Sequence, residues 1–202
     1  MLLIVGLFSC QNKKSQVIEN KSSNIVQDSI LNKEFVKISA TEIPDNMIKL
    51  ISQDWMLITA GNKDKFNTMT ASWGTLGELW GKNVSIIFVR DTRYTYEFLN
   101  NNDSYTLAFF TDDYRTALQI CGTKSGRDCD KVAEAGLTPR FLESGNVAFE
   151  EARLIIECKK LYSDPFKKEN FISPDFFEQI YSKDTSVHTM YVGEILNVWI
   201  KK

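Results

Sequence analysis

The chain has 202 residues, of which 43% are hydrophobic and 25% charged, and its formal net charge is -2. This length suits one domain with a sizeable core, and the composition is that of a globular protein. The near-neutral charge predicts that the chain binds no nucleic acid and is not drawn to an acidic membrane surface. The spacing of Cys121 and Cys129, with a single histidine in the chain, favours neither a metal site nor a disulfide framework.

Residues 1–10 resemble the signal segment of a bacterial lipoprotein. An apolar run, LLIVGLF, is too short to span a bilayer and is followed by Ser9, Cys10 and a polar stretch. In such signals cleavage leaves the cysteine as the lipid-modified first residue, so Cys10 is the predicted lipidation site and the lipid anchor is the expected attachment to a membrane. No Lys or Arg precedes the apolar run, as an export signal normally requires, so a disordered apolar tail in a cytoplasmic protein is the alternative. Export predicts a location in the periplasm or at the cell surface.

Residues 11–34 are rich in Asn, Lys, Ser and Gln and show no sustained hydrophobic period, which predicts a flexible tether. The folded domain is therefore expected to span residues 35–202.

Within that domain, the hydrophobic pattern predicts strands separated by short helices. A first helix is expected after Ile43, with Pro44 near its start and Asp45 in its first turn. Strands are predicted over 55–60, 67–73, 84–89, 104–110, 152–158 and 188–200, and further helices over 94–102, 114–121 and after Asp128.

Two of these strands carry a clear burial signal. The run 84–89 is almost entirely apolar, which predicts a strand buried on both faces. In 152–158, apolar residues alternate with Arg153 and Glu157, which are expected on the opposite face, and Cys158 should be a buried small hydrophobe. Because strands and helices do not alternate strictly, a closed or split antiparallel barrel fits better than a doubly wound parallel sheet.

The sequence contains no glycine-rich dinucleotide fingerprint, no phosphate-binding P-loop and no serine nucleophile elbow. Three other segments are candidates for a binding site. The first, NTMTASWG at 67–74, places hydroxyls and Trp73 on an extended stretch that could contact a flat heterocycle. The alternative for this segment is an edge strand with hydroxyls that face solvent.

The second segment, RDTRYTYEFL at 90–99, places Arg93 and Thr95 where a helix begins. Free backbone N–H groups, guanidinium groups and a hydroxyl there would form a phosphate site. The alternative is a helix cap with two solvated arginines, although basic residues oppose the dipole at this end of a helix. The third segment, GTKSGRDCDK at 122–131, is a basic turn before a helix that could bind an anion, although such a segment, taken alone, is more often an ordinary polar loop.

Taken in order, these segments resemble the flavin reductase-like, FMN-binding split-barrel family, including its flavoredoxin-type members. The resemblance runs from about Trp55 to about Ile195. It rests on the motifs NTMTASW at 67–73, RYTYEF at 93–98, KSGRDCDK at 124–131, EARLIIEC at 151–158 and HTMYVGE at 188–194.

This resemblance implies a mainly β fold with inserted short helices, an FMN-binding split β-barrel of Greek-key antiparallel type, and a homodimer with FMN near the subunit interface. It places the isoalloxazine and ribityl chain against Thr70, Ala71, Ser72 and Trp73. It places the phosphate end against Arg90, Arg93, Tyr94 and Thr95, with Lys124, Ser125, Gly126 and Lys131 contributing from the loop. The candidate catalytic residue is His188, near the flavin face where a nicotinamide would stack.

The expected activity is therefore that of an FMN-dependent NAD(P)H oxidoreductase, with a small molecule or a protein as electron acceptor. The alternative is an extracytoplasmic flavin-binding or electron-transfer module fed by a protein partner, because NAD(P)H would be scarce around an exported domain.

Overall fold

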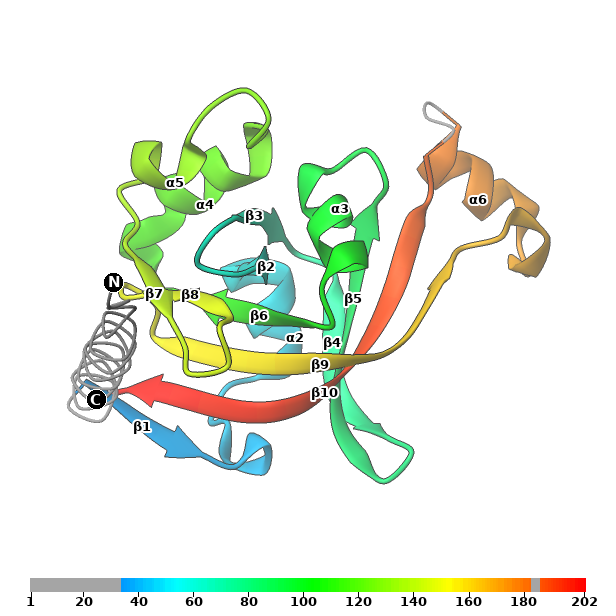
Figure 1. Cartoon of the computed structure of the whole chain (residues 1–202). Helices are drawn as coiled ribbons and strands as arrows, with labels where there is room; N and C mark the ends of the chain where they lie inside the picture. The colour runs from blue at the N-terminus through cyan, green and yellow to red at the C-terminus, as the bar shows by residue number, and fades with distance from the viewer. Residues whose placement is uncertain (1–33, 183–185) are drawn as a thin grey trace, which may run out of the picture. The chain divides into compact units, whose positions relative to one another are not determined.

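The computed structural model describes residues 34–182 and 186–202 (Figure 1). The predicted signal segment, the lipidation site Cys10 and residues 11–33 of the predicted tether lie outside the described residues. The chain divides into two units: the larger is Lys37–Lys201, and the described residues 34–36 and Lys202 belong to the other. Strand β1 (Phe35–Ile38) begins in the smaller unit, and every later element belongs to the larger one.

The strands of the larger unit are β2 (Met56–Gly61), β3 (Phe66–Ala71), β4 (Gly74–Leu79), β5 (Lys82–Arg90), β6 (Ser104–Phe109), β7 (Pro139–Phe141), β8 (Val147–Phe149), β9 (Leu154–Pro165) and β10 (His188–Lys201). Its helices are α2 (Met47–Lys49), α3 (Tyr94–Asn101), α4 (Arg115–Thr123), α5 (Lys131–Glu134) and α6 (Pro174–Tyr181). Short turns complete it: the 3-10 turns η1 (Ala40–Glu42), η3 (Asp112–Tyr114) and η4 (Lys168–Asn170), and the π-helical turn η2 (Leu50–Asp54).

Seven strands of this unit pair in the order β3-β2-β6-β9-β10-β5-β4, and β7 and β8 form a separate hairpin. All of these pairings are antiparallel. The predicted fold class, mainly antiparallel β with short inserted helices, is confirmed. In the part of the chain that the structure describes, no helix is both long and apolar enough to cross a membrane.

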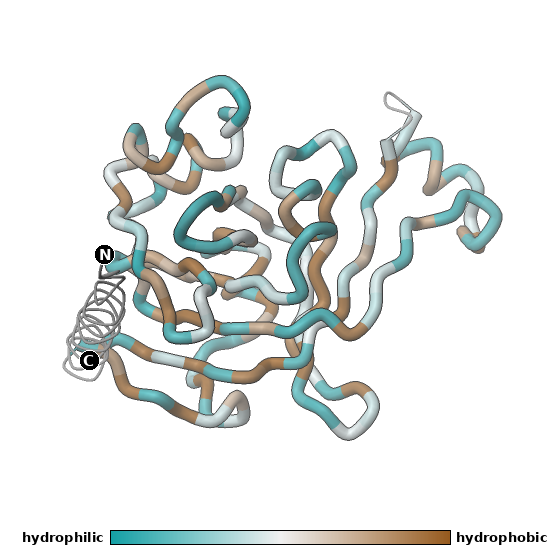
Figure 2. The backbone as a smooth tube through the Cα atoms, viewed as in Figure 1, coloured by the Kyte–Doolittle hydropathy of each residue, from teal (hydrophilic) through white to brown (hydrophobic). Residues whose placement is uncertain are grey.

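The core forms where the sequence is most apolar. All six residues of β2 are buried, and three of them, Met56, Ile58 and Ala60, belong to a core cluster to which β3, β5, β6, β9, β10 and α3 also contribute. Figure 2 shows hydrophilic residues gathered in connecting loops such as the one between β2 and β3. Cys158 is fully buried in this core, as predicted.

Strand β4 was not predicted. It pairs with β5 through a two-residue turn, Trp80-Gly81, in which both residues have positive φ angles of 56° and 68°. Such turns match the right-handed twist of the flanking strands, but they normally place Asn or Asp before Gly. Trp80 at that position concealed the hairpin in the sequence.

Three local predictions were wrong. The first helix begins after Asn46, whose side chain caps it, so Pro44 and Asp45 precede the helix, and Asp45 instead forms an ion pair with Arg153. Strand β5 is not buried on both faces, because Ile86 and Phe88 are partly exposed.

The third wrong prediction concerns β9, where Glu157 is buried instead of facing solvent. Its carboxylate accepts hydrogen bonds from three side chains, those of Ser144, Asn146 and Asn197. These donors replace the water that a buried carboxylate loses, so the β7–β8 hairpin segment covers a face that the alternating pattern assigned to solvent.

Helices α3 and α4 both pack against β3, and α3 and α4 also contact β2. Strand β3 is therefore covered although it lies at the end of the strand order. The start of α3 and the end of α4 meet beside it, and the candidate site lies there.

Candidate functional site

A small pocket lies between β3, the start of α3 and the segment that joins α4 to α5. Its volume is about 90 Å³. The lining residues are Met69, Thr92, Arg93, Tyr94, Thr95, Thr123, Lys124, Ser125 and Lys131, and we refer to it as the basic pocket. Six of the twelve residues predicted to bind a cofactor therefore line one pocket, although they come from two separate segments of the chain.

Strand β3 holds both helices in place through polar side chains. The buried amide of Asn67 donates to Thr95 Oγ1 over 2.7 Å, which fixes the first turn of α3. The hydroxyl of Thr70 donates to the carbonyl oxygen of Leu118 in α4. Thr68 is fully buried and hydrogen-bonds to Thr59. Strand β3 does lie at the edge of the strand order, but the hydroxyls of Thr68 and Thr70 are bonded within the protein, and only that of Ser72 belongs to a partly exposed residue.

Two cationic groups converge on the basic pocket. Arg93 is the residue that precedes α3, and its guanidinium donates to the carbonyl oxygen of Gly122 over 2.9 Å. Lys131 is 4% exposed, and its ammonium donates to the carbonyl oxygens of Cys121 and Lys124 at 3.1 and 3.2 Å. Burial lowers the pKa of Lys131, and the positive charge of Arg93 lowers it further. Since carbonyl oxygens carry no net charge, the pocket favours an anion.

The loop after α4 completes the pocket. The ammonium of Lys124 pairs with Glu134, so an acidic partner balances the charge of this lining residue. Gly126 lies directly against β3: a Cβ atom there would be 2.1 Å from Asn67 Oδ1. This close approach requires glycine and places the loop beside the residue that holds α3.

A second group of side chains lies where β3 ends and β10 begins, and we refer to Trp73, His188, Tyr181 and Arg90 as the aromatic strip. The rings of Trp73 and His188 are 5.0 Å apart, and the Tyr181 hydroxyl lies 3.0 Å from His188 Nδ1. The guanidinium of Arg90 lies 5.5 Å from the Tyr181 ring. Arg90 is thus placed with His188, its cross-strand neighbour, and is not among the residues that line the basic pocket.

His188 is neutral at physiological pH. Burial lowers its pKa to about 4, and the positive charges of Arg90 and Arg93 contribute to the shift. When Tyr181 donates its hydrogen bond to Nδ1, the imidazole proton lies on Nε2. The strip then presents a neutral, oriented imidazole beside a half-exposed indole, close enough to the basic pocket to sense Arg93.

The remaining predicted residues have different placements. Ala71 is buried in the core, so it can offer only its backbone to a ligand, whereas Ser72 is partly exposed beside Trp73. Sequence reasoning missed Asn67 and Tyr181 as supporting residues. A polar amide within a predicted strand was a signal for Asn67, because a buried amide needs a partner; no signal indicated Tyr181.

Comparison with known proteins identifies the family. A model of the flavin reductase-like domain matches residues 48–202. The chain belongs to the flavin reductase-like family. A comparison with curated proteins found no match.

Solved structures share the fold of this flavin reductase-like chain. An FMN-binding domain of a flavin reductase-like enzyme from Shewanella baltica has a TM-score of 0.60 at 13% identity, covering 82% of this chain and 76% of that one. Flavoredoxin from Methanosarcina acetivorans has a TM-score of 0.59 at 20% identity, with coverage of 83% and 75%. An NADH:FAD oxidoreductase from Streptomyces globisporus has a TM-score of 0.56 at 14% identity, with coverage of 74% and 78%.

Gly126→Ala should disturb the basic pocket of this flavin reductase-like domain. The added methyl group displaces Asn67 and thereby loosens Thr95, at a cost of about 1–3 kcal/mol in the free energy of unfolding, measured by urea denaturation. Gly77→Ala is the matched control, because a Cβ atom added at Gly77 would have open space within 4 Å. Equal stability of the two variants would contradict the close contact between this loop and β3.

The pKa of His188 makes stability depend on pH. Its folded value of about 4 lies below that of an unfolded histidine, so the stability it contributes is complete above about pH 6.5 and is lost as the pH falls through about 4. The full shift corresponds to about 3 kcal/mol, which partial exposure reduces to about 1–2 kcal/mol. Between about pH 6.5 and pH 4, the His188→Gln variant should therefore lose about 1–2 kcal/mol less free energy of unfolding than the wild-type chain, as measured by urea denaturation at each pH.

Because the chain has one histidine, proton NMR of its single imidazole measures the same pKa directly. A titration midpoint near the ordinary value of about 6.5 would contradict the burial of His188 beside Arg90 and Arg93.

Proposed function

We propose that this chain binds FMN and acts as an FMN-dependent NAD(P)H oxidoreductase, with the FMN phosphate in the basic pocket. The observation that carries the proposal is that two cations, the buried ammonium of Lys131 and the guanidinium of Arg93, lie in one pocket at the start of a helix. A phosphate monoester brings one to two negative charges and several acceptor oxygens, which offset the cost of holding two cations together. The start of α3 adds the positive end of a helix dipole.

The isoalloxazine ring has a matching surface next to this pocket. From Met69 in the pocket lining, the chain continues through Thr70, Ala71 and Ser72 to Trp73, so one extended segment joins the phosphate site to the aromatic strip. Backbone groups and the partly exposed Ser72 hydroxyl would contact the ring edge and the ribityl chain, and Trp73 would cover part of the ring. Thr70 would act by holding α4, since its hydroxyl is bonded to Leu118.

Bound FMN would supply acceptance and release of a hydride, a reaction for which the protein needs no nucleophile of its own. Arg90 and Arg93 place positive charge around the strip, which favours a reduced, anionic flavin. His188 would position the nicotinamide as a neutral hydrogen-bonding group oriented by Tyr181. That the similarly folded Streptomyces protein is an NADH:FAD oxidoreductase supports a nicotinamide donor.

A second candidate function is an extracytoplasmic electron-transfer module that receives electrons from a protein. The lipoprotein-type segment at residues 1–10 favours it, because a domain that is exported and anchored by a lipid on Cys10 would meet little NAD(P)H. In both cases we propose a homodimer, on the strength of the family resemblance.

The phosphate assignment predicts the effect of a single substitution. Arg93→Ala should weaken FMN binding about 10- to 100-fold, as expected for loss of a charge-assisted hydrogen bond, and leave riboflavin binding unchanged. Flavin fluorescence titration measures both affinities. Arg115→Ala is the control, because this arginine lies 4.4 Å from the Trp55 ring and is not among the lining residues of the basic pocket. An Arg93→Ala variant with unchanged FMN affinity would refute the assignment.

The electron donor is tested by anaerobic titration of the FMN-loaded chain with NADH, followed by absorption. Rapid bleaching of the flavin band indicates an NADH-dependent reductase, and His188→Ala should slow this bleaching more than it weakens FMN binding. A perturbed band that NADH does not bleach would support the partner-fed module. Equal loss of both properties in His188→Ala would show that His188 has only a structural role.

A further inference from the structure

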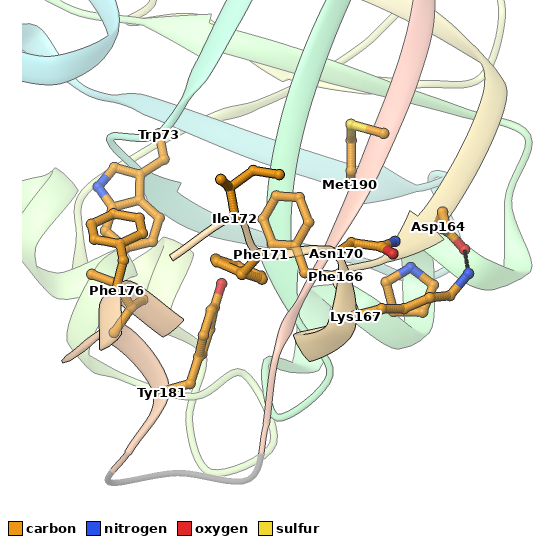
Figure 3. Close-up of a pocket in the computed structure, with 12 residues that line it drawn as sticks. Trp73, Asp164, Phe166, Lys167, Asn170, Phe171, Ile172, Phe176, Tyr181 and Met190 are labelled. Atoms are coloured by element: carbon orange, nitrogen blue, oxygen red, sulfur yellow. Dashed lines mark ion pairs between the residues drawn. The ribbon is translucent and has the colours of Figure 1, made fainter. Parts of the chain in front are cut away.

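A second, much larger pocket opens beside the aromatic strip. Its volume is about 680 Å³, and it lies between Trp73, the end of β9, the loop after it, α6 and Met190 of β10. Figure 3 shows Trp73 and Phe176 at one end and the Asp164–Lys167 ion pair at the other, with Phe166, Phe171 and Ile172 between them. We refer to it as the aromatic pocket.

The segment after β9 builds this pocket around one ring. The Phe171 ring lies 6.1 Å from that of Phe166, 6.5 Å from that of Phe176 and 6.2 Å from that of Tyr181. Ser173 caps α6 and Pro174 occupies its first turn, so the helix start that positions Phe176 is well defined. The wall of the pocket is therefore anchored by packing.

Large apolar side chains nevertheless remain exposed there. Trp73 is 50% exposed, Phe176 53% and Ile172 fully exposed. Apolar side chains that line a hollow of this size are typical of a small-molecule site, since such sites occupy about 300–1,000 Å³ and are lined mainly by hydrophobic and aromatic residues.

The charge of the aromatic pocket is balanced. Lys167 is the cation among its described lining residues, and its ammonium lies 3.3 Å from Asp164. The neighbouring Lys168 is paired with Glu178. A pyrophosphate-containing dinucleotide would thus meet no unpaired lysine in this lining, in contrast to the convergent cations of the basic pocket.

We propose that the aromatic pocket binds an uncharged, planar ring compound of the quinone type as a second ligand next to the flavin. Trp73 and Tyr181 belong to both the aromatic strip and this pocket, so the ligand would lie against the same indole that borders the flavin ring. The inference rests on the proposed function for that neighbouring flavin, while the pocket itself is formed by this chain alone. Aromatic walls favour stacking on a flat ring, and paired charges at the rim disfavour an ionic ligand.

Isothermal titration calorimetry of the full chain with duroquinone, with and without FMN, tests this proposal. Duroquinone is uncharged, and its fully substituted ring does not add to thiols. We expect saturable binding at one site in the absence of FMN. Binding should be about tenfold weaker in Phe176→Ala, because the substitution removes a ring whose exposed half the ligand would cover. Trp80→Ala is the matched control, because Trp80 is an exposed aromatic residue on the β4–β5 turn, outside the lining.

Each outcome has one meaning for the pocket. Absence of duroquinone binding to a chain that binds FMN, or equal affinities of Phe176→Ala and Trp80→Ala, would overturn the inference and leave the proposed function intact. Phe176-dependent binding of duroquinone to a chain that does not bind FMN would refute the proposed function and keep the pocket. The wild-type chain could also be a dimer that does not bind duroquinone, while Phe176→Ala is a monomer. That result would assign this face to the interface with a second copy of the chain and would overturn the inference.

Discussion

The hydrogen bond from Asn67 to Thr95 is the contact on which the candidate site depends. It joins the interior of β3 to the first turn of α3, while Thr70, three residues further along β3, holds α4. Both partners of the first bond are buried, so breaking it would leave polar groups without water and would cost more than the bond itself contributes. One strand thereby sets the distance between the two helix ends that form the basic pocket.

This arrangement places the positive charges of Lys131 and Arg93 at a pocket where an anionic ligand can bind to them. Lys131 is desolvated and lies near Arg93, which lowers its pKa, and both cations bond to carbonyl oxygens instead of carboxylates. The positive charge of such a site is poorly balanced in the absence of a bound anion. An anion that binds there interacts strongly with both cations, because little water is present to screen the charges. The extended segment from Met69 to Trp73 joins the basic pocket to the aromatic strip, so a ligand with a charged tail and a flat ring matches both.

The sequence predicted the fold class and most strands because their hydrophobic patterns follow simple periods, as in β2 and β10. The helix start at Arg93 and Thr95 and the basic turn before Lys131 each indicated an anion site, and the family resemblance joined them into one. Arg90 and Gly126 belonged to that predicted set but do not line the basic pocket. It did not predict that Glu157 is buried or that Tyr181 meets His188, since both depend on segments far away in sequence. The β4–β5 hairpin was missed because Trp80 occupies a turn position that usually carries a different residue.

The affinities of the wild-type chain for FMN and for riboflavin, measured side by side, test the central claim most directly. The two ligands share the isoalloxazine ring and ribityl chain and differ only in the phosphate. If Lys131 and Arg93 hold that phosphate, FMN should bind at least about 100-fold more tightly, corresponding to two charge-assisted hydrogen bonds. Equal affinities would contradict the assignment of the basic pocket as the phosphate site.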